Sequence, residues 1–100
     1  MPRSLFDLTG KTALVTGGNS GVGLGYARGM ARQGASIITW GRDVDKNHAA
    51  AEVLRAAGSP RVTSDIVDVT SEEAVAAGFA RAIKDVGRLD CVVSNAGHAT

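Results

Sequence analysis

The chain has little cysteine and no long apolar run. Cys91 is its only cysteine, so an internal disulfide or a cysteine-based zinc site cannot form. Because Cys91 lies in a short apolar run, we expect an inert, buried thiol. No run approaches the ~18 apolar residues that would span a membrane. Residues 1–10 carry Asp7 and have no apolar stretch typical of a secretory signal. We therefore expect a cytoplasmic protein with no membrane partner.

Charge of one sign is not concentrated anywhere in the sequence. The 11 basic and 10 acidic side chains are interspersed and give a formal net charge of +1. No basic stripe indicates nucleic-acid binding, and no acidic tail indicates a disordered segment. Aromatic residues make up only 4%, whereas small apolar residues are abundant, which suits close packing of helices on a sheet. We expect residues 1–100 to form a single small domain.

A repeating unit organises the chain: a short β-branched run, a turn, and a longer alanine-rich amphipathic run. The predicted strands are Thr12–Thr16, Ser36–Trp40, Val62–Val67 and Asp90–Ser94. The predicted helices are Ser20–Gln33, Asp43–Ala57 and Ser71–Lys84. The strand runs are almost continuously apolar, as is typical of parallel strands buried on both faces. With right-handed crossovers, this alternation predicts an α/β fold, a Rossmann-type doubly wound parallel sheet with strand order 3-2-1-4.

The residues at the helix ends fit this interpretation. Gly34 and Gly58 stand where helices commonly end in a left-handed residue. Asp43 fits the N-cap of the second helix, and Thr70 with Glu73 fits a capping box at the third. The fourth strand would be an uncovered edge. We therefore expect the native sheet to continue beyond this chain, which would be truncated at its C-terminus.

A glycine-rich loop joins the first predicted strand to the first helix. Gly17, Gly21 and Gly23 form the pattern G-x-x-x-G-x-G. Backbone N–H groups in such a loop approach a pyrophosphate, and the helix N-terminus adds the positive end of its dipole. We expect Gly25 and Gly29 only to let the helix lie close to the sheet. The G-x-G-x-G pattern from Gly21 to Gly25 leaves a methyltransferase as an alternative, although that loop should follow its strand directly.

Three segments match one family in order and spacing. They are Thr16-Gly17-x-x-x-Gly21-x-Gly23, Asp68-Val69 and Leu89-Asp90-x-x-x-Ser94-Asn95-Ala96-Gly97. On these residues the chain, from Leu5 onward, resembles the classical short-chain dehydrogenase/reductase family. Ser94 stands where the family usually has asparagine. The resemblance implies the N-terminal, cofactor-binding portion of an NAD(P)-dependent oxidoreductase.

The resemblance also implies which residues bind the cofactor. Asn19 and Ser20 either contact phosphate or ribose or only cap the loop, and Asp68 either binds adenine or only begins the turn before a helix. The expected cofactor-binding residues are Gly17, Asn19, Ser20, Gly21, Val22, Gly23, Arg42, Asp68, Val69, Asn95, Ala96 and Gly97. The last three would lie beside the nicotinamide ribose.

Cofactor preference is set at the end of the second predicted strand. NAD sites carry an acid there, and NADP sites use a nearby arginine. In the register that the family resemblance implies, Gly41 takes the acid's place. Arg42 follows, either as a bidentate partner for a 2′-phosphate or as a solvated surface charge. Asp43 competes as a ribose acceptor, and Trp40 either stacks near adenine or simply packs. We therefore expect NADP(H) rather than NAD(H).

Catalytic residues have no counterpart in this chain. In the family they are a serine, a Tyr-x-x-x-Lys pair and a further asparagine, all downstream. The only tyrosine, Tyr26, is followed four residues later by Met30, and we expect it to pack. We expect His48 to be solvated and assign His98 no catalytic role. We expect no metal site, and for Asp65 a charge-stabilised turn contact.

The leading hypothesis is the cofactor-binding half of an NADP(H)-dependent oxidoreductase that interconverts a carbonyl and a secondary alcohol by hydride transfer. The chain alone would be inactive, and the full-length protein would be a homo-oligomer acting on a small molecule. The first alternative is a non-catalytic nicotinamide-dinucleotide-binding module completed by a partner chain. The second is a marginally folded fragment that binds nothing well. Substrate and stereochemistry would depend on residues beyond this chain.

Overall fold

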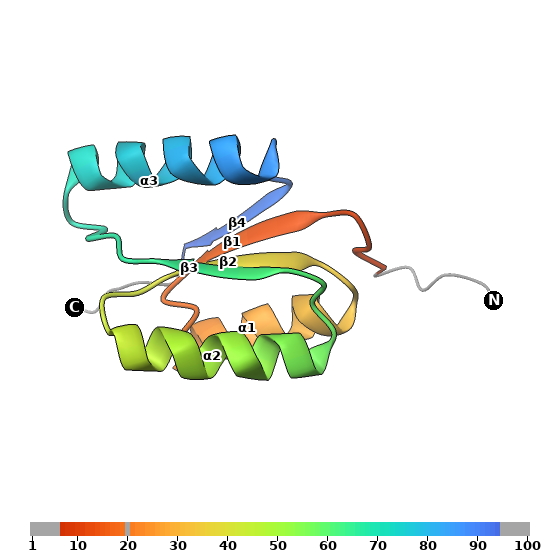
Figure 1. Cartoon of the computed structure of the whole chain (residues 1–100). Helices are drawn as coiled ribbons and strands as arrows, with labels where there is room; N and C mark the ends of the chain where they lie inside the picture. The colour runs from red at the N-terminus through yellow and green to blue at the C-terminus, as the bar shows by residue number, and fades with distance from the viewer. Residues whose placement is uncertain (1–6, 20, 95–100) are drawn as a thin grey trace.

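Four parallel strands form the centre of the computed structural model, which describes residues 7–19 and 21–94 (Figure 1). The strands are β1 (Thr12–Thr16), β2 (Ser36–Trp40), β3 (Val62–Asp65) and β4 (Cys91–Ser94). The helices are α1 (Gly21–Arg32), α2 (Val44–Ala57) and α3 (Glu72–Val86). All strand pairs are parallel, and their order is β3-β2-β1-β4. The predicted α/β fold and strand order are confirmed.

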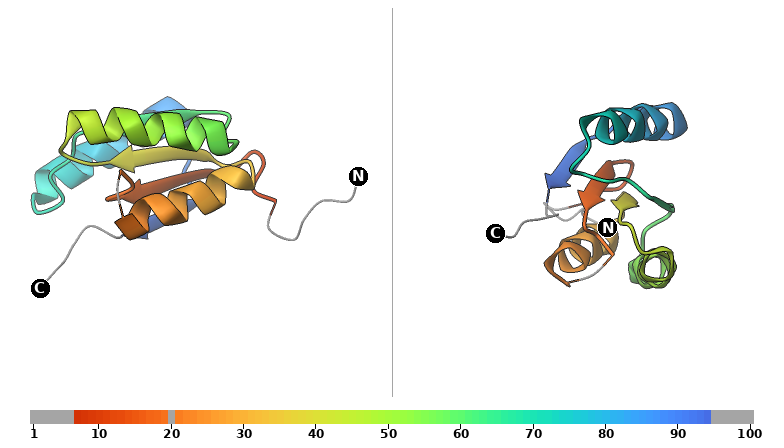
Figure 2. Two further views of the ribbon diagram at one scale, coloured as in Figure 1. Left: turned by 90° about the horizontal axis from the view of Figure 1, so that it is seen from below. Right: turned by 90° about the vertical axis from the view of Figure 1, so that its left-hand side faces the viewer.

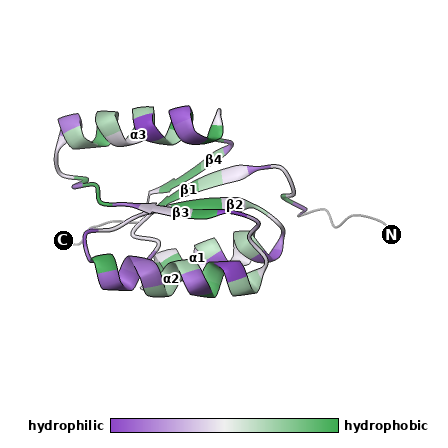
Figure 3. Cartoon of the chain, in the orientation of Figure 1, coloured by the Kyte–Doolittle hydropathy of each residue, from purple (hydrophilic) through white to green (hydrophobic). Residues whose placement is uncertain are grey.

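Helices cover both faces of the sheet. Helices α1 and α2 lie on one face and α3 on the other (Figures 1 and 2). Under α1 and α2 the buried residues are Ala13, Val15, Ala27, Ala31, Ala35, Ile37, Ala51, Leu54 and Val62. Under α3 they are Leu14, Ile38, Trp40, Val67 and Ala82. Alternate residues of β1 and β2 thus point to opposite cores, which explains why both strands are continuously apolar while the helices alternate in hydropathy (Figure 3).

The carboxyl ends of the strands meet at one edge of the sheet. Thr16 pairs with Trp40 and with Ser94, and Trp40 pairs with Asp65. Two backbone hydrogen bonds continue the ladder past the strand ends, from Gly17 N to Trp40 O at 2.9 Å and from Gly41 N to Asp65 O at 3.2 Å. The loops that follow the first three strands are therefore held side by side.

Some of the predicted helix ends are confirmed and one is wrong. Asp43 caps α2 by accepting a hydrogen bond from Lys46 N, and Gly58 follows the helix at a φ of 126°. At α3 the N-cap is Ser71, which accepts from Ala74 N, whereas we expected Thr70. The Thr70 hydroxyl is already committed to Asp68, so the next residue caps the helix. Strand β3 ends at Asp65 instead of Val67, because its register with β2 ends there.

The predicted inner face of α1 is also wrong. Its buried residues are Gly23, Ala27 and Ala31, spaced four apart. Gly25 and Gly29 point away from the sheet, and a Cβ at either position would meet no atom within 4 Å. Tyr26, which we expected to pack, is 56% exposed. The close approach of α1 to the sheet therefore depends on a different stripe of small residues.

Strand β4 forms an edge of the sheet among the described residues, where it pairs with β1 alone. Cys91 is exposed on this strand, so the expectation of a buried thiol is wrong. Val92 is 48% exposed for the same reason. His48 is exposed on α2, as expected.

Candidate functional site

A groove lies at the carboxyl edge of the sheet, where the loops after β1, β2 and β3 meet. Its volume is about 690 Å³. The residues that line it are Gly17, Asn19, Trp40, Gly41, Arg42, Asp43, Lys46, Val67, Asp68, Val69 and Thr70. The groove thus brings together predicted cofactor residues from all three loops, although they lie far apart in the sequence.

The glycine-rich loop forms one end of the groove. Gly17 and Gly21 have φ angles of 67° and 58°, which favour glycine over any residue with a side chain. A Cβ at Gly18 would lie 2.8 Å from Thr39 Cγ2 and 3.1 Å from Val15 O, so the loop lies directly on the sheet. The N–H of Gly17 is committed to β2. Beyond this loop, the first turn of α1 offers N–H groups that have no partner within the helix and can donate to an anion.

The first turn of α1 contains Gly21, Val22 and Gly23. Val22 is 65% exposed, and Gly23 is buried against the sheet. These three residues are not among the described residues that line the groove. They lie at the positive end of the helix dipole, which favours an anion at this position.

Asn19 is held by a buried asparagine. Its Nδ2 donates to Asn47 Oδ1 at 2.9 Å, and Asn47 Nδ2 donates in turn to Gly41 O at 3.0 Å. Asn47 is 3% exposed. The amide of Asn19 thus has the loop-fixing role that was one of our two interpretations. The sequence did not indicate this role for Asn47, because a polar residue on a helix is normally expected to be exposed to solvent.

Two basic residues line the part of the groove that follows β2. Arg42 is exposed and forms no hydrogen bond or ion pair within residues 7–19 and 21–94. Lys46 lies in the first turn of α2, and the sequence analysis missed it. The Asp43 carboxylate between them caps the helix, which favours the N-cap over the ribose-acceptor interpretation. The sequence pattern that could have indicated Lys46 is a pair of basic residues, four positions apart, on either side of an N-cap.

Asp68 lies across the groove from these cations. Its Oδ1 accepts hydrogen bonds from the Thr70 hydroxyl at 2.6 Å and from Thr70 N at 2.9 Å. The Thr70 hydroxyl, the Thr70 N–H and, more weakly, the Arg42 charge lower the pKa of Asp68 from its ordinary value. Because these bonds use Oδ1 alone, Oδ2 stays available as an acceptor. The turn and an adenine contact are therefore compatible roles.

Trp40 packs in the core. It is 2% exposed, and its ring meets Phe79 edge to face with centroids 5.0 Å apart. Its indole N–H has no hydrogen-bond partner within the described part of the chain. Packing, one of the two roles we considered, is the one the structure supports.

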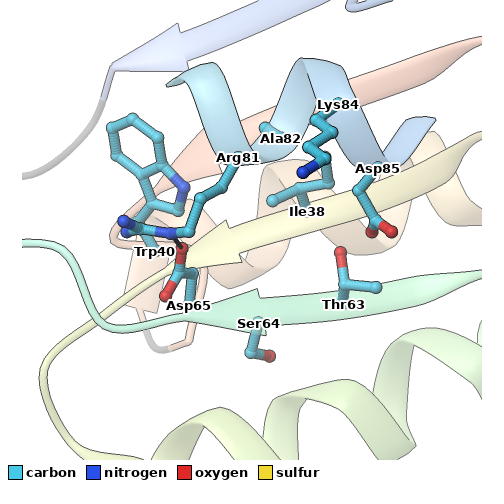
Figure 4. Close-up of a pocket in the computed structure, with 9 residues that line it drawn as sticks. All are labelled: Ile38, Trp40, Thr63, Ser64, Asp65, Arg81, Ala82, Lys84 and Asp85. Atoms are coloured by element: carbon cyan, nitrogen blue, oxygen red, sulfur yellow. Dashed lines mark hydrogen bonds and ion pairs between the residues drawn. The ribbon is translucent and has the colours of Figure 1, made fainter. Parts of the chain in front are cut away.

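A second hollow, of about 420 Å³, lies between β2, β3 and α3 (Figure 4). Arg81 reaches past the Trp40 indole to Asp65, and their ion pair measures 2.8 Å (Figure 4). Asp65 also accepts from Ile66 N, so the expected charge-stabilised turn contact is confirmed. Asp85 of the same hollow pairs with Arg61. Three charged residues of this hollow, Asp65, Arg81 and Asp85, are therefore already engaged in ion pairs.

Part of the predicted site lies outside the described residues. This applies to Ser20 and His98 and to the expected nicotinamide-ribose segment Asn95, Ala96 and Gly97. In the described ranges, no three His, Cys, Asp or Glu side chains group as metal ligands would. None of the helices in these ranges has the length and apolar character needed to cross a membrane.

Comparisons with known proteins agree on the family. A family model described as short chain dehydrogenase matches residues 11–100. Gluconate 5-dehydrogenase of Gluconobacter oxydans (strain 621H) is 40% identical over 93 residues, which are 93% of this chain and 36% of that protein. The chain thus spans about a third of the length of the curated relatives it matches.

Solved structures give the same result. L-sorbose reductase from Gluconobacter frateurii, complexed with NADPH and L-sorbose, matches with a TM-score of 0.88 and 38% identity, over 95% of this chain and 36% of that one. NAD⁺-bound xylitol dehydrogenase matches with a TM-score of 0.86 and 33% identity, over 91% of this chain and 35% of that one. The chain belongs to the short-chain dehydrogenase family.

Proposed function

We propose that this chain is the cofactor-binding part of an NADP(H)-dependent oxidoreductase that interconverts a carbonyl and a secondary alcohol by hydride transfer. Membership of the family supports the reaction class. The observation that carries the cofactor preference is the pair of cations, Arg42 and Lys46, beside a glycine at position 41. The related L-sorbose reductase was solved with NADPH and xylitol dehydrogenase with NAD⁺, so the preference has to be argued from this chain's own residues.

Charge at the end of β2 favours a 2′-phosphate. This group carries about two negative charges at neutral pH. Arg42 and Lys46 supply two positive charges, and the Asp43 carboxylate is committed to the cap of α2. A site for NAD would instead carry an acid to accept from both ribose hydroxyls. With Gly41 there, that acceptor is missing from the end of β2.

With the 2′-phosphate at Arg42 and Lys46, the positions of the pyrophosphate and the adenine can be proposed as well. The pyrophosphate would lie at the glycine-rich loop and the N-terminus of α1, where N–H groups and the helix dipole favour an anion. Asp68 Oδ2 and the backbone at Val69 would bind the adenine across the groove. When bound, the nicotinamide supplies the hydride chemistry. The described residues bind and orient the cofactor and include no Tyr-x-x-x-Lys pair for proton transfer.

We further propose that residues 1–100 are one part of a single dinucleotide-binding domain and catalyse no turnover by themselves. The full-length protein would form a homo-oligomer and act on a small-molecule carbonyl or alcohol. The exposed β4 edge keeps open a second function, a non-catalytic binding module completed by another chain at that edge. Sedimentation of the purified protein with and without cofactor, together with a turnover assay, separates the two. Binding without turnover in a stable complex with another chain favours the module.

A titration tests the cofactor assignment directly. The readout is the heat of binding, measured by calorimetry, which reports on either reduced cofactor. The longest natural protein that contains this chain is titrated with NADPH and with NADH. We expect NADPH to saturate the signal at a clearly lower concentration. Equal affinities, or a preference for NADH, would refute the proposal.

A further inference from the structure

Asn47 is a buried polar residue on a helix face that is otherwise apolar. The other buried residues of α2 are Ala50, Ala51 and Leu54. A buried amide lowers stability unless its hydrogen bonds are satisfied. Asn47 satisfies them with two groups of the candidate groove, Asn19 Nδ2 at 2.9 Å and Gly41 O at 3.0 Å. One side chain therefore bridges the loop after β1 and the loop after β2.

The bridge also fills the space beside Gly41. A Cβ at Gly41 would collide with Asn19 Nδ2 and would lie 2.6 Å from Asn47 Oδ1. We therefore expect a side chain at position 41 to displace one of the two hydrogen-bonded amides. Since Asn47 is buried, its amide has little room to move, and a shift of Asn19 would leave Asn47 Oδ1 without its partner. An acid at position 41, as an NAD site would carry, conflicts with this pair.

The Asn47 bridge also fixes the backbone that immediately precedes Arg42. The Gly41 carbonyl accepts from Asn47, while the Gly41 N–H donates to Asp65 O at 3.2 Å. The backbone just before Arg42 is thus held from both sides. The same bridge holds Asn19 in the loop that would receive the pyrophosphate. The two anion-binding loops are joined through one buried amide.

We propose that Asn47 is a specificity-determining positioning residue, which bridges Asn19 and the Gly41 carbonyl and so makes the groove favour a dinucleotide with a 2′-phosphate. The inference rests on the proposed NADP(H) function and adds to it. Arg42 would contact the phosphate, whereas Asn47 acts through Gly41 without touching the cofactor. Loops that are already ordered lower the entropic cost of binding a ligand. Here the dinucleotide with a 2′-phosphate would benefit most, because it would contact both loops.

The first test compares Asn47→Leu with wild type in the longest natural protein that contains this chain. Leucine has a similar volume and removes both hydrogen bonds, and His48→Ala, on the exposed side of α2, is the matched control. Calorimetry gives the dissociation constants for NADP⁺ and NAD⁺. We expect Asn47→Leu to weaken NADP⁺ binding about tenfold and NAD⁺ binding much less, as for loss of one or two buried hydrogen bonds. A merely structural role would weaken both equally or leave both unchanged, and either result overturns the proposal.

The second test places a side chain at position 41, and it remains informative if Asn47→Leu fails to fold. Gly41→Asp alone should gain little NAD⁺ affinity, because the Asn19–Asn47 pair blocks the new side chain. Gly41→Asp combined with Asn19→Ala and Asn47→Ala removes both blocking amides and should bind NAD⁺ several-fold more tightly than Gly41→Asp alone. Equal NAD⁺ affinity in the single and triple variants overturns the inference. A wild-type preference for NAD⁺ would refute the proposed function itself, which keeps the two failures distinct.

Discussion

Removing the Arg42 side chain should weaken NADP⁺ binding far more than NAD⁺ binding. Arg42 is exposed, lines the groove and has no hydrogen-bond partner among the described residues, so its guanidinium is free to bind an anion. Hydrogen bonds to charged groups contribute ~1.5–3 kcal/mol each. Exposure to solvent reduces that contribution, and Lys46 remains as a second cation.

These opposing effects give the size of the expected change. A net loss of ~1.5–2 kcal/mol corresponds to a roughly 10- to 30-fold weaker NADP⁺ affinity for Arg42→Ala. NAD⁺ lacks the 2′-phosphate, so its affinity should change less than about threefold. Because the site is exposed, the difference should shrink as ionic strength rises, since salt screens exposed charges.

Calorimetry with both cofactors at low and at physiological salt measures this difference. Arg28→Ala, which removes an exposed arginine on α1 away from the groove, is the matched control. If Arg42→Ala weakens the binding of both cofactors equally, Arg42 does not recognise the 2′-phosphate. A tighter NAD⁺ affinity in Arg42→Ala, with NADP⁺ unchanged, would likewise contradict the reasoning.

Three further predictions concern stability. Gly18→Ala should destabilise the protein by about 1–3 kcal/mol in urea unfolding, because its Cβ would meet Thr39 Cγ2 at 2.8 Å and a backbone carbonyl at 3.1 Å. Ser71→Ala should cost about 1 kcal/mol as a lost N-cap of α3, and Ser71→Asp should restore most of it. Folding lowers the pKa of Asp68, so its contribution to stability is present above the ordinary value of 3.8 and is lost as the pH falls through the folded-state pKa. Unfolding of Asp68→Asn as a function of pH should lack this part of the acid dependence, and an unchanged profile would assign it to other carboxylates.

The bounds of β1 and β2 were predictable because they depend on local pattern, and the strand order was predictable because crossovers between parallel strands are right-handed. The bounds of β1 and β2 agree with the prediction, and the two strands pair residue by residue from Thr12 with Ser36 to Thr16 with Trp40. Their continuous apolar runs reflect burial on both faces. Such burial follows from helices on both sides of the sheet, which the alternation of strands and helices already implied.

The inner face of α1 was not predictable from the sequence. Small residues occupy every second position from Gly23 to Ala31, so helical periodicity fits two stripes equally well. The structure selects Gly23, Ala27 and Ala31 over Gly25 and Gly29. The rotation of the helix about its axis depends on the loop before it, where Gly17 and Gly21 have positive φ angles. Sequence pattern contains no comparable information about that rotation.

The candidate site also contains residues that were predictable from the sequence and residues that were not. Gly17, Arg42 and Asp68 lie in the loops just after three strands, so predicting the strands placed them at one edge of the sheet. Asn47 lies on a helix, and its role depends on contact with a loop that precedes it by 28 positions. No local pattern distinguishes a buried, bridging asparagine from a solvated one. The contacts that join the loops were therefore missed, whereas several residues that line the groove could be predicted from the positions of the strands.

The sheet itself sets the spacing of the groove. Hydrogen bonds from Gly17 N to Trp40 O and from Gly41 N to Asp65 O extend the strand ladder into the loops. A slip of β2 by one residue would move Arg42 by ~3.3 Å along the strand direction and turn each β2 side chain to the opposite face. Trp40 would then leave its contact with Phe79 and the core under α3. The packing of the buried β2 side chains, Trp40 among them, therefore holds the register that brings Arg42 to the groove, so fold stability and the proposed cofactor preference depend on the same strand.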